Sequence, residues 1–169
     1  MAHLGKNLLI GLAAGVAGTA AMDAYWMGLA KIKPEWVQSE GEPATQKVAR
    51  RALRKAGVKS PSQQTRRVGG KTVHWSYGGS WGLVAGASRA AGAPITWGGG
   101  QLFGAGLWAL GDLWMLYKMD LSKHPSEYPA EVHATALGAH LAYGLAVWAT
   151  MKGLGGMTGS RRRKLRRAA

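Results

Sequence analysis

The sequence predicts an all-α integral membrane protein with about four transmembrane helices and a basic amphipathic helix between the first and the second. Two features predict this class. Mean hydropathy is near zero only because nearly uncharged stretches alternate with segments that carry most of the 22 Lys and Arg and 8 Asp and Glu residues. The 26 glycines lie among Ala, Leu, Val and Trp, a mixture typical of transmembrane helices, whose backbones approach closely at small residues.

Four apolar segments are the candidate spans, at residues 8–30, 74–91, 95–117 and 132–151. A spanning helix needs roughly 20 mainly apolar residues, and only the second segment, which contains Arg89, falls short. A soluble four-helix bundle is the alternative, but it requires polar outer faces, and these segments are weakly polar all round. The first run exceeds the roughly 7–15 residues of a signal peptide, so we expect a retained helix. The spans form one domain over residues 1–158.

The stretch 31–72 between the first two spans is basic, and its centre predicts a helix from Pro43 to Gly57. Pro43 suits a first helical position and Gly57 suits a stop. Apolar residues recur at helical spacing on one side, with basic residues on the other: Ala44, Val48, Ala52, Leu53 and Ala56 against Lys47, Arg50, Arg51, Arg54 and Lys55. Such a helix lies either on an anionic lipid surface or on its own protein, and the sequence leaves both open.

A basic tail covers residues 159–169 and contains Arg161, Arg162, Arg163, Lys164, Arg166 and Arg167. A run of this kind is typical of a cytoplasmic or surface tail near the anionic headgroups of a bilayer. No nucleic-acid-binding motif accompanies it, so the expected partner is the lipid bilayer and not nucleic acid.

Four spans place both termini and the 92–94 connection on one side, called here the tail end, and the other two loops on the opposite side, called the loop end. Basic residues are numerous at both ends, so the positive-inside rule leaves open which end faces the cytoplasm.

Ionisable residues within the spans gather in the loop-end half. Asp23 precedes Lys31 by about 12 Å and Asp112 precedes Lys118 by about 9 Å of helical rise. His74 and His133 lie near the starts of their spans, and His140 lies about 10 Å below His133. Gln101 shares a helical face with Trp108 and Asp112. The predicted polar pocket therefore consists of Asp23, Asp112, His133, His140, His74 and Gln101.

Two interpretations of this pocket stay open. A polar cavity could move protons or hold a small cation or polar ligand, because carboxylates inside a membrane are costly and point inward toward partners. Alternatively, the same side chains form hydrogen bonds that only join the helices, at roughly 0.6–2 kcal/mol each. In either case we expect Asp112 to lie within reach of His140, ahead of His133, directly or through one water.

Several other kinds of site are not expected. The chain has no cysteine, which excludes disulfides, thiol catalysis and Cys-type zinc sites. His133 and His140 with two distant carboxylates do not have a recognised metal-ligand spacing. The Gly98–Gly106 run lacks a preceding strand and a following Lys-Ser or Lys-Thr, so it is not a nucleotide loop. We predict no metal, no cofactor and, without a nucleophile–base pair, no enzyme activity.

Glycines four residues apart predict close helix contacts: Gly11 and Gly15, Gly78 and Gly82, Gly82 and Gly86, and Gly100 and Gly104. The spacing indicates contact but not the partner, so these faces could join helices of one chain, of a homo-oligomer or of a larger membrane complex.

The four spans together resemble a known family. The segments GLAAGVAGTAAMDA, VHWSYGGSWGLVAG, GLWALGDLW and EYPAEVHATALGAHLAYGLAVW are similar to those of small bacterial membrane proteins grouped as DUF1440, or YagU-like. The resemblance implies a multi-pass protein of the bacterial inner (cytoplasmic) membrane with no assigned molecular function. It also implies an acidic residue late in the third span and His in the fourth, the places of Asp112, His133 and His140. The family's frequent Asp-Glu pair is absent, because Leu113 follows Asp112.

The sequence therefore favours a small membrane protein that acts in transport or in proton or ion handling through a loop-end pocket. The alternative is a non-catalytic scaffold or accessory subunit of a larger membrane complex.

Overall fold

A computed structural model describes residues 2–37 and 41–168 of the chain, with side chains described up to residue 155. The chain forms α1 (Ala2–Ile32), α2 (Ala44–Lys55), α3 (Gln63–Ala90), α4 (Gln101–Trp108), α5 (Leu116–Lys118) and α6 (Ala130–Ala168). Short 3₁₀ turns cover Pro34–Trp36, Gly98–Gly100 and Pro125–Glu127, and a π-helical segment, Ala109–Met115, joins α4 to α5. The described residues contain no strand, which confirms the predicted all-α class.

The predicted amphipathic helix is confirmed, and its limits have the expected causes. Pro43 caps the start of α2, and Gly57 follows its end with a φ of +93°. That backbone conformation carries no penalty for glycine, because it has no Cβ.

The second and third segments differ from prediction. α3 begins at Gln63 instead of 74, because the Ser62 side chain accepts a hydrogen bond from the Thr65 N–H (3.1 Å) and starts the helix within the basic stretch. The third is interrupted: glycines with positive φ precede α4, and the π-helical segment follows it. The fourth continues as α6 to Ala168, through the predicted tail; the tail's side chains, and residue 169, lie outside the described part of the chain.

One helix in the described part of the chain, over His3–Ile32, is long and apolar enough to cross a membrane. By this criterion the other three predicted spans are not confirmed, since α3 starts with polar and basic residues and the third segment is broken into short pieces. A signal sequence, or the core helix of a soluble protein, can have the same length and composition. One such helix near the N-terminus is therefore weak support for a membrane location.

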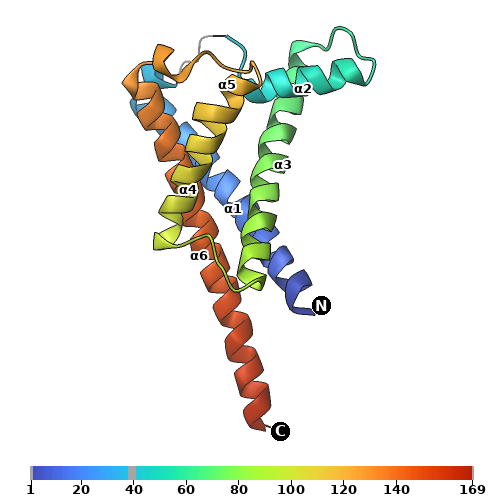
Figure 1. The fold of residues 1–169 in the computed structure, drawn as a ribbon, viewed down its shortest axis with the longest axis vertical. Helices are drawn as coiled ribbons and strands as arrows, with labels where there is room; N and C mark the ends of the chain where they lie inside the picture. Colours follow the sequence, from blue (N-terminus) through green and yellow to red (C-terminus); the bar gives the residue numbers. More distant parts are fainter. Residues whose placement is uncertain (1, 38–40, 169) are drawn as a thin grey trace.

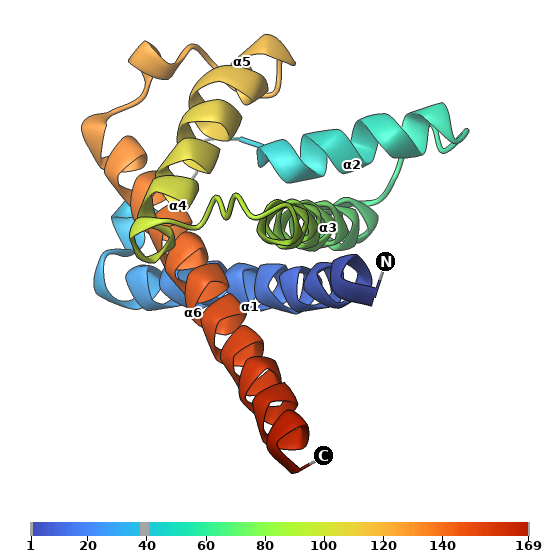
Figure 2. The ribbon, with the colours of Figure 1, turned by 60° about the horizontal axis from the view of Figure 1, so that its bottom comes forward.

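The helices form a bundle in which α1 packs on both α3 and α6, α4 packs on α6, and α2 lies crosswise on the start of α3 (Figure 1). Figure 2 shows α6 crossing α1. Both termini lie at the lower end of Figure 1, the tail end, and α2 and α5 lie at the upper end, the loop end.

Backbone-to-backbone contact joins the helices at two glycine seams. In the first, Gly11 and Gly15 of α1 lie against Gly78, Gly82 and Gly86 of α3, and a Cβ on Gly82 would meet the carbonyl oxygen of Gly11. The second joins Gly100 and Gly104 to Gly144 and the His140 carbonyl of α6. Each predicted glycine pair thus makes its close contact within one chain, so these faces build the monomer.

Candidate functional site

A cavity of about 400 Å³ opens between the helices at the loop end. Its walls come from α1, α3, the π-helical segment and α6, and most of its lining is apolar, including Met22, Val73, Leu107, Met115 and Leu116. Ionisable lining groups are few, namely His74, Asp112 and His140 beside two tyrosines, Tyr77 and Tyr143. Asp112 is the only carboxylate among the described lining residues.

Aromatic side chains close the cavity toward the tail end. Trp81, Phe103 and Tyr143 form a chain of ring contacts, with centroids 6.4 and 6.2 Å apart. The Tyr143 hydroxyl is buried and donates a hydrogen bond to the Gly78 carbonyl (2.6 Å), which ties α6 to α3. Gly78 of the first glycine seam also lines the cavity, so the cavity reaches the point where close packing begins.

Asp112 and His140 approach each other in the cavity wall, as predicted. His140 Nδ1 lies 3.8 Å from Asp112 Oδ2 and 2.9 Å from the Ala136 carbonyl oxygen. Because a carbonyl oxygen only accepts, Nδ1 donates its proton to Ala136. The Asp112 carboxylate therefore has no direct hydrogen bond from the described residues.

Asp23 and His74 form a second carboxylate–imidazole pair, between α1 and α3. Their Oδ1 and Nε2 atoms are 3.2 Å apart, with side-chain exposures of 42% for Asp23 and 28% for His74. His74 lines the cavity, but Asp23 does not. The prediction that Asp23 faces the shared interior is wrong: it contacts His74 from a more exposed position.

Two further residues of the predicted pocket lie outside the cavity. The His133 Nε2 atom is 2.9 Å from the Pro125 carbonyl oxygen, and its ring packs between Trp108 and Tyr128. It therefore holds the 125–128 turn onto α6. Gln101 is exposed at the first turn of α4, near the tail end. The expected Gln101–Trp108–Asp112 face assumed a regular α-helix, whereas the π-helical segment Ala109–Met115 bonds i to i+5 and changes the direction of Asp112.

The tyrosines of the site escaped the sequence reasoning, although a signal existed. Tyr77 follows His74 by three residues and Tyr143 follows His140 by three, so each pair occupies neighbouring turns of one helical face. The repeated His-x-x-Tyr spacing could have identified both.

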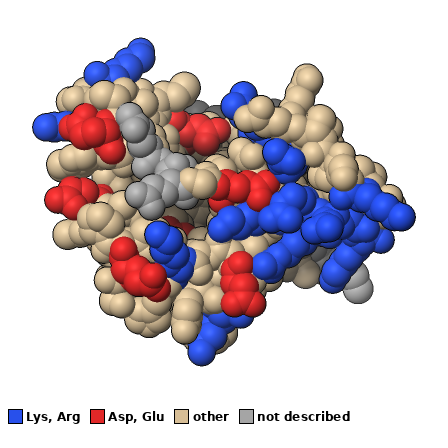
Figure 3. Space-filling view, turned by 90° about the horizontal axis from the view of Figure 1, so that it is seen from above, with Lys and Arg blue, Asp and Glu red and all other residues tan. Residues whose placement is uncertain are grey.

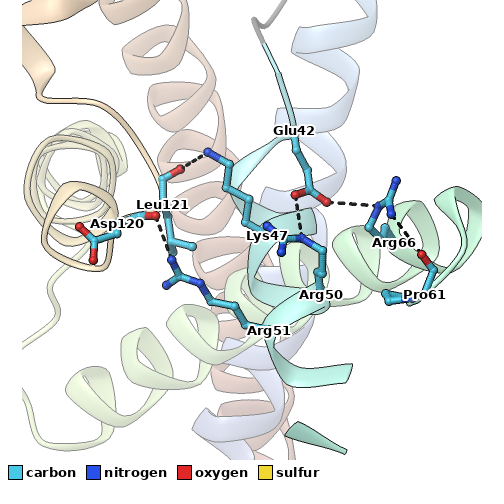
Figure 4. Close-up of polar contacts among 8 residues, drawn as sticks. All are labelled: Glu42, Lys47, Arg50, Arg51, Pro61, Arg66, Asp120 and Leu121. Carbon is cyan, nitrogen blue, oxygen red and sulfur yellow. Dashed lines mark hydrogen bonds and ion pairs between the residues drawn. The ribbon is translucent and has the colours of Figure 1, made fainter. Parts of the chain in front are cut away.

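α2 lies over the loop end of the cavity and is tied to the far wall. Ala44, Thr45 and Val48 line the cavity from above. Lys47 Nζ donates to the Leu121 carbonyl (2.9 Å), and Arg51 donates to the Asp120 carbonyl (3.0 Å; Figure 4). Arg51 also donates to the Met119 carbonyl (2.6 Å). These carbonyls follow α5, where a helix end leaves acceptors free and favours cations. Of the two positions left open for this helix, the structure shows packing on its own protein.

Just before α2 begins, the Glu42 carboxylate forms ion pairs with Arg50 (3.0 Å) and with Arg66 of α3 (3.3 Å; Figure 4). α2 is therefore tied to the 119–121 segment on one side, is linked through Glu42 to α3 on the other, and forms a strap across the cavity.

The described residues contain no group of three or more His, Asp or Glu side chains that could hold a metal ion. Comparison of the chain with protein-family models, with curated proteins and with solved structures gives no match.

Proposed function

We propose that the protein is a multi-pass membrane protein that binds a small, mainly apolar molecule with a cationic group in the loop-end cavity and exchanges it for a proton. One observation carries this proposal: Asp112 is the only carboxylate in the described lining of a largely apolar cavity, and His140 approaches it only to 3.8 Å. A carboxylate in such surroundings is stable with a proton or with a cation beside it. The apolar walls favour an organic cation over a bare metal ion.

The exchange follows from the chemistry of the pair. When the ammonium group of the ligand reaches Asp112, the protonated carboxyl group releases its proton to water, and the resulting carboxylate forms the ion pair. When the ligand leaves, a proton returns. His140 can take part, because its Nδ1 atom donates to the Ala136 carbonyl and its other ring nitrogen is then the acceptor.

The outer surface of the bundle supports a membrane location. Large apolar side chains are exposed on several helices, among them Leu9 (71%), Val84 (46%), Leu102 (72%) and Leu145 (45%). A soluble protein rarely leaves apolar surface of this extent uncovered. We therefore keep, as proposals, the four-span arrangement, the multi-pass location in a bacterial inner membrane and the resemblance to the DUF1440, or YagU-like, proteins.

Binding of 1-naphthylmethylamine, a small aromatic amine, tests the cavity. The purified protein in neutral detergent should bind it with 1:1 stoichiometry, measured by equilibrium dialysis, and Asp112→Asn should weaken binding at least tenfold. Asp120→Asn is the matched control: it removes one carboxylate at the loop end outside the cavity, at a φ of +52° that Asn tolerates.

Equal binding by the Asp112→Asn protein and the wild type would overturn the proposal and favour the accessory-subunit alternative. Exchange is tested in proteoliposomes: amine entry should release internal protons, reported by an enclosed pH dye, in the wild type and not in Asp112→Asn.

A further inference from the structure

A second hollow lies outside the cavity, in the corner between α2 and α3. This groove of about 570 Å³ is lined mainly by apolar and small residues, including Ala49, Ala52 and Leu53 of α2 and Val68 and Thr72 of α3. Val68 is 60% exposed although it lies in the groove. Val73 lines both the groove and the cavity, so its side chain separates the two.

Cations gather around this corner. In Figure 3, Lys and Arg side chains form a continuous patch on one side of the loop end, while the acidic side chains are scattered over the rest of that face. Arg50 and Arg66 share Glu42, and Arg51 contacts carbonyl groups. The remaining members have no acidic partner within ion-pair distance among the described residues. They are Arg54, Lys55, Lys59, Arg67 and Lys71, called here the basic corner.

The arrangement is unfavourable without an anion. Arg67 and Lys71 are four residues apart on α3, as are Arg51 and Lys55 on α2, and like charges at this spacing destabilise a helix. The basic corner also flanks the groove along the chain: Arg54 and Lys55 follow Leu53, and Arg67 and Lys71 precede Val68 and Thr72. Cations and an apolar slot are thus presented together.

We infer that this corner binds an anionic phospholipid, with one acyl chain in the groove and the phosphate among the cations of the basic corner. The inference rests on the proposed membrane location. A crosswise amphipathic helix at the end of a bundle lies at the depth of the headgroups, where basic residues meet anionic lipid. A soluble anion or a nucleic acid would use the cations but has no need of an apolar groove beneath them.

The experiment compares lipid-dependent stabilisation of the purified full-length protein in neutral detergent. Thermal unfolding is followed with added phosphatidylglycerol, phosphatidylcholine, glycerol 3-phosphate or a short DNA duplex, and retained lipid is counted by native mass spectrometry. We expect phosphatidylglycerol to bind at least about tenfold more tightly than phosphatidylcholine, with no stabilisation by glycerol 3-phosphate or DNA. Stabilisation by glycerol 3-phosphate equal to that by the lipid, or tighter binding of DNA, would overturn the inference.

Two variants test the binding of the lipid headgroup and the binding of the acyl chain separately. Arg67→Gln with Lys71→Gln should lower the preference for phosphatidylglycerol by about 10- to 30-fold, since each surface cation contributes about 1 kcal/mol. Val68→Trp fills the groove and should reduce retention of both lipids while leaving the cations in place. Lys31→Gln with Lys33→Gln is the matched control: it removes two exposed loop-end cations away from the groove and should leave the preference unchanged. An unchanged preference in the Arg67/Lys71 variant, or unchanged retention in Val68→Trp, contradicts the site.

The same samples distinguish this inference from the proposed function. The Arg67/Lys71 variant should bind 1-naphthylmethylamine like the wild type, and Asp112→Asn should keep the phosphatidylglycerol preference. If either variant lost both the binding of the amine and the preference for phosphatidylglycerol, the corner and the cavity would instead be one site.

Discussion

At the tail end of the bundle helices touch backbone to backbone, whereas at the loop end the same helices stand apart around a cavity. The α1–α3 pair shows the change along its length. Gly11 and Gly15 meet the glycines of α3 directly, Thr19 lies against Gly78, and Asp23 and His74 meet only through their side chains at 3.2 Å. Glycine lets two backbones approach because nothing projects between them, while large side chains require space that they do not fill completely. One helix pair therefore supplies both a rigid seam and a wall of the cavity.

The largest expected effect is at the first glycine seam. In Gly82→Ala the new Cβ would collide with the carbonyl oxygen of Gly11 and the Cα of Gly15, and backbone atoms cannot move aside as a flexible side chain can. We expect a loss of roughly 3 kcal/mol or more in the free energy of unfolding, measured in detergent by thermal or denaturant unfolding. Gly106→Ala is the control, because its Cβ meets nothing, and it should change stability by less than about 1 kcal/mol. Similar results for both would show that the seam does not hold the bundle.

An intermediate effect is expected in the cavity wall. His140→Leu removes the imidazole 3.8 Å from Asp112 and its hydrogen bond to the Ala136 carbonyl, and leaves the acid among apolar groups, so it should cost roughly 1–3 kcal/mol. His133→Leu loses the hydrogen bond to Pro125 and the edge contacts with the Trp108 and Tyr128 rings, but Leu keeps apolar packing there, so we expect a loss of about 1 kcal/mol. Adding Asp112→Leu to the His140→Leu protein should restore much of its stability, because no polar group is then left in the apolar cavity without a neighbour. If His133→Leu proves the more damaging change, the loop-end half depends on the 125–128 turn and not on the acid.

The smallest effect on stability is expected at the strap. Arg51→Gln loses its hydrogen bonds to the carbonyls of Met119 and Asp120, which are exposed, so the unfolding free energy should fall by no more than about 1 kcal/mol. Amide hydrogen exchange in α2 should nevertheless become faster, since the strap opens locally without unfolding the bundle. Arg54→Gln is the control: it removes an exposed cation of α2 that has no hydrogen bond to the 119–121 carbonyls, and it should leave the exchange of α2 unchanged.

Much of this architecture was predictable because the signals are local. Apolar length predicted that these segments are largely helical, and Pro43 and Gly57 predicted the approximate limits of α2. Glycine spacing predicted the seams, though not that both lie within one chain. The rise of a helix gave the depths of Asp112 and His140 well enough to predict their proximity.

The sequence by itself thus determined that the chain is helical, the approximate limits of α2 and the proximity of Asp112 to His140. Only the tertiary structure decided which faces meet. Gln101, His133 and Asp23 lie outside the cavity, and α2 lies across it, because those outcomes depend on the crossing of distant helices and on the π-helical segment Ala109–Met115. Local periodicity defines a direction around a regular helix, but one extra residue per turn or a tilted neighbour redirects every side chain beyond it.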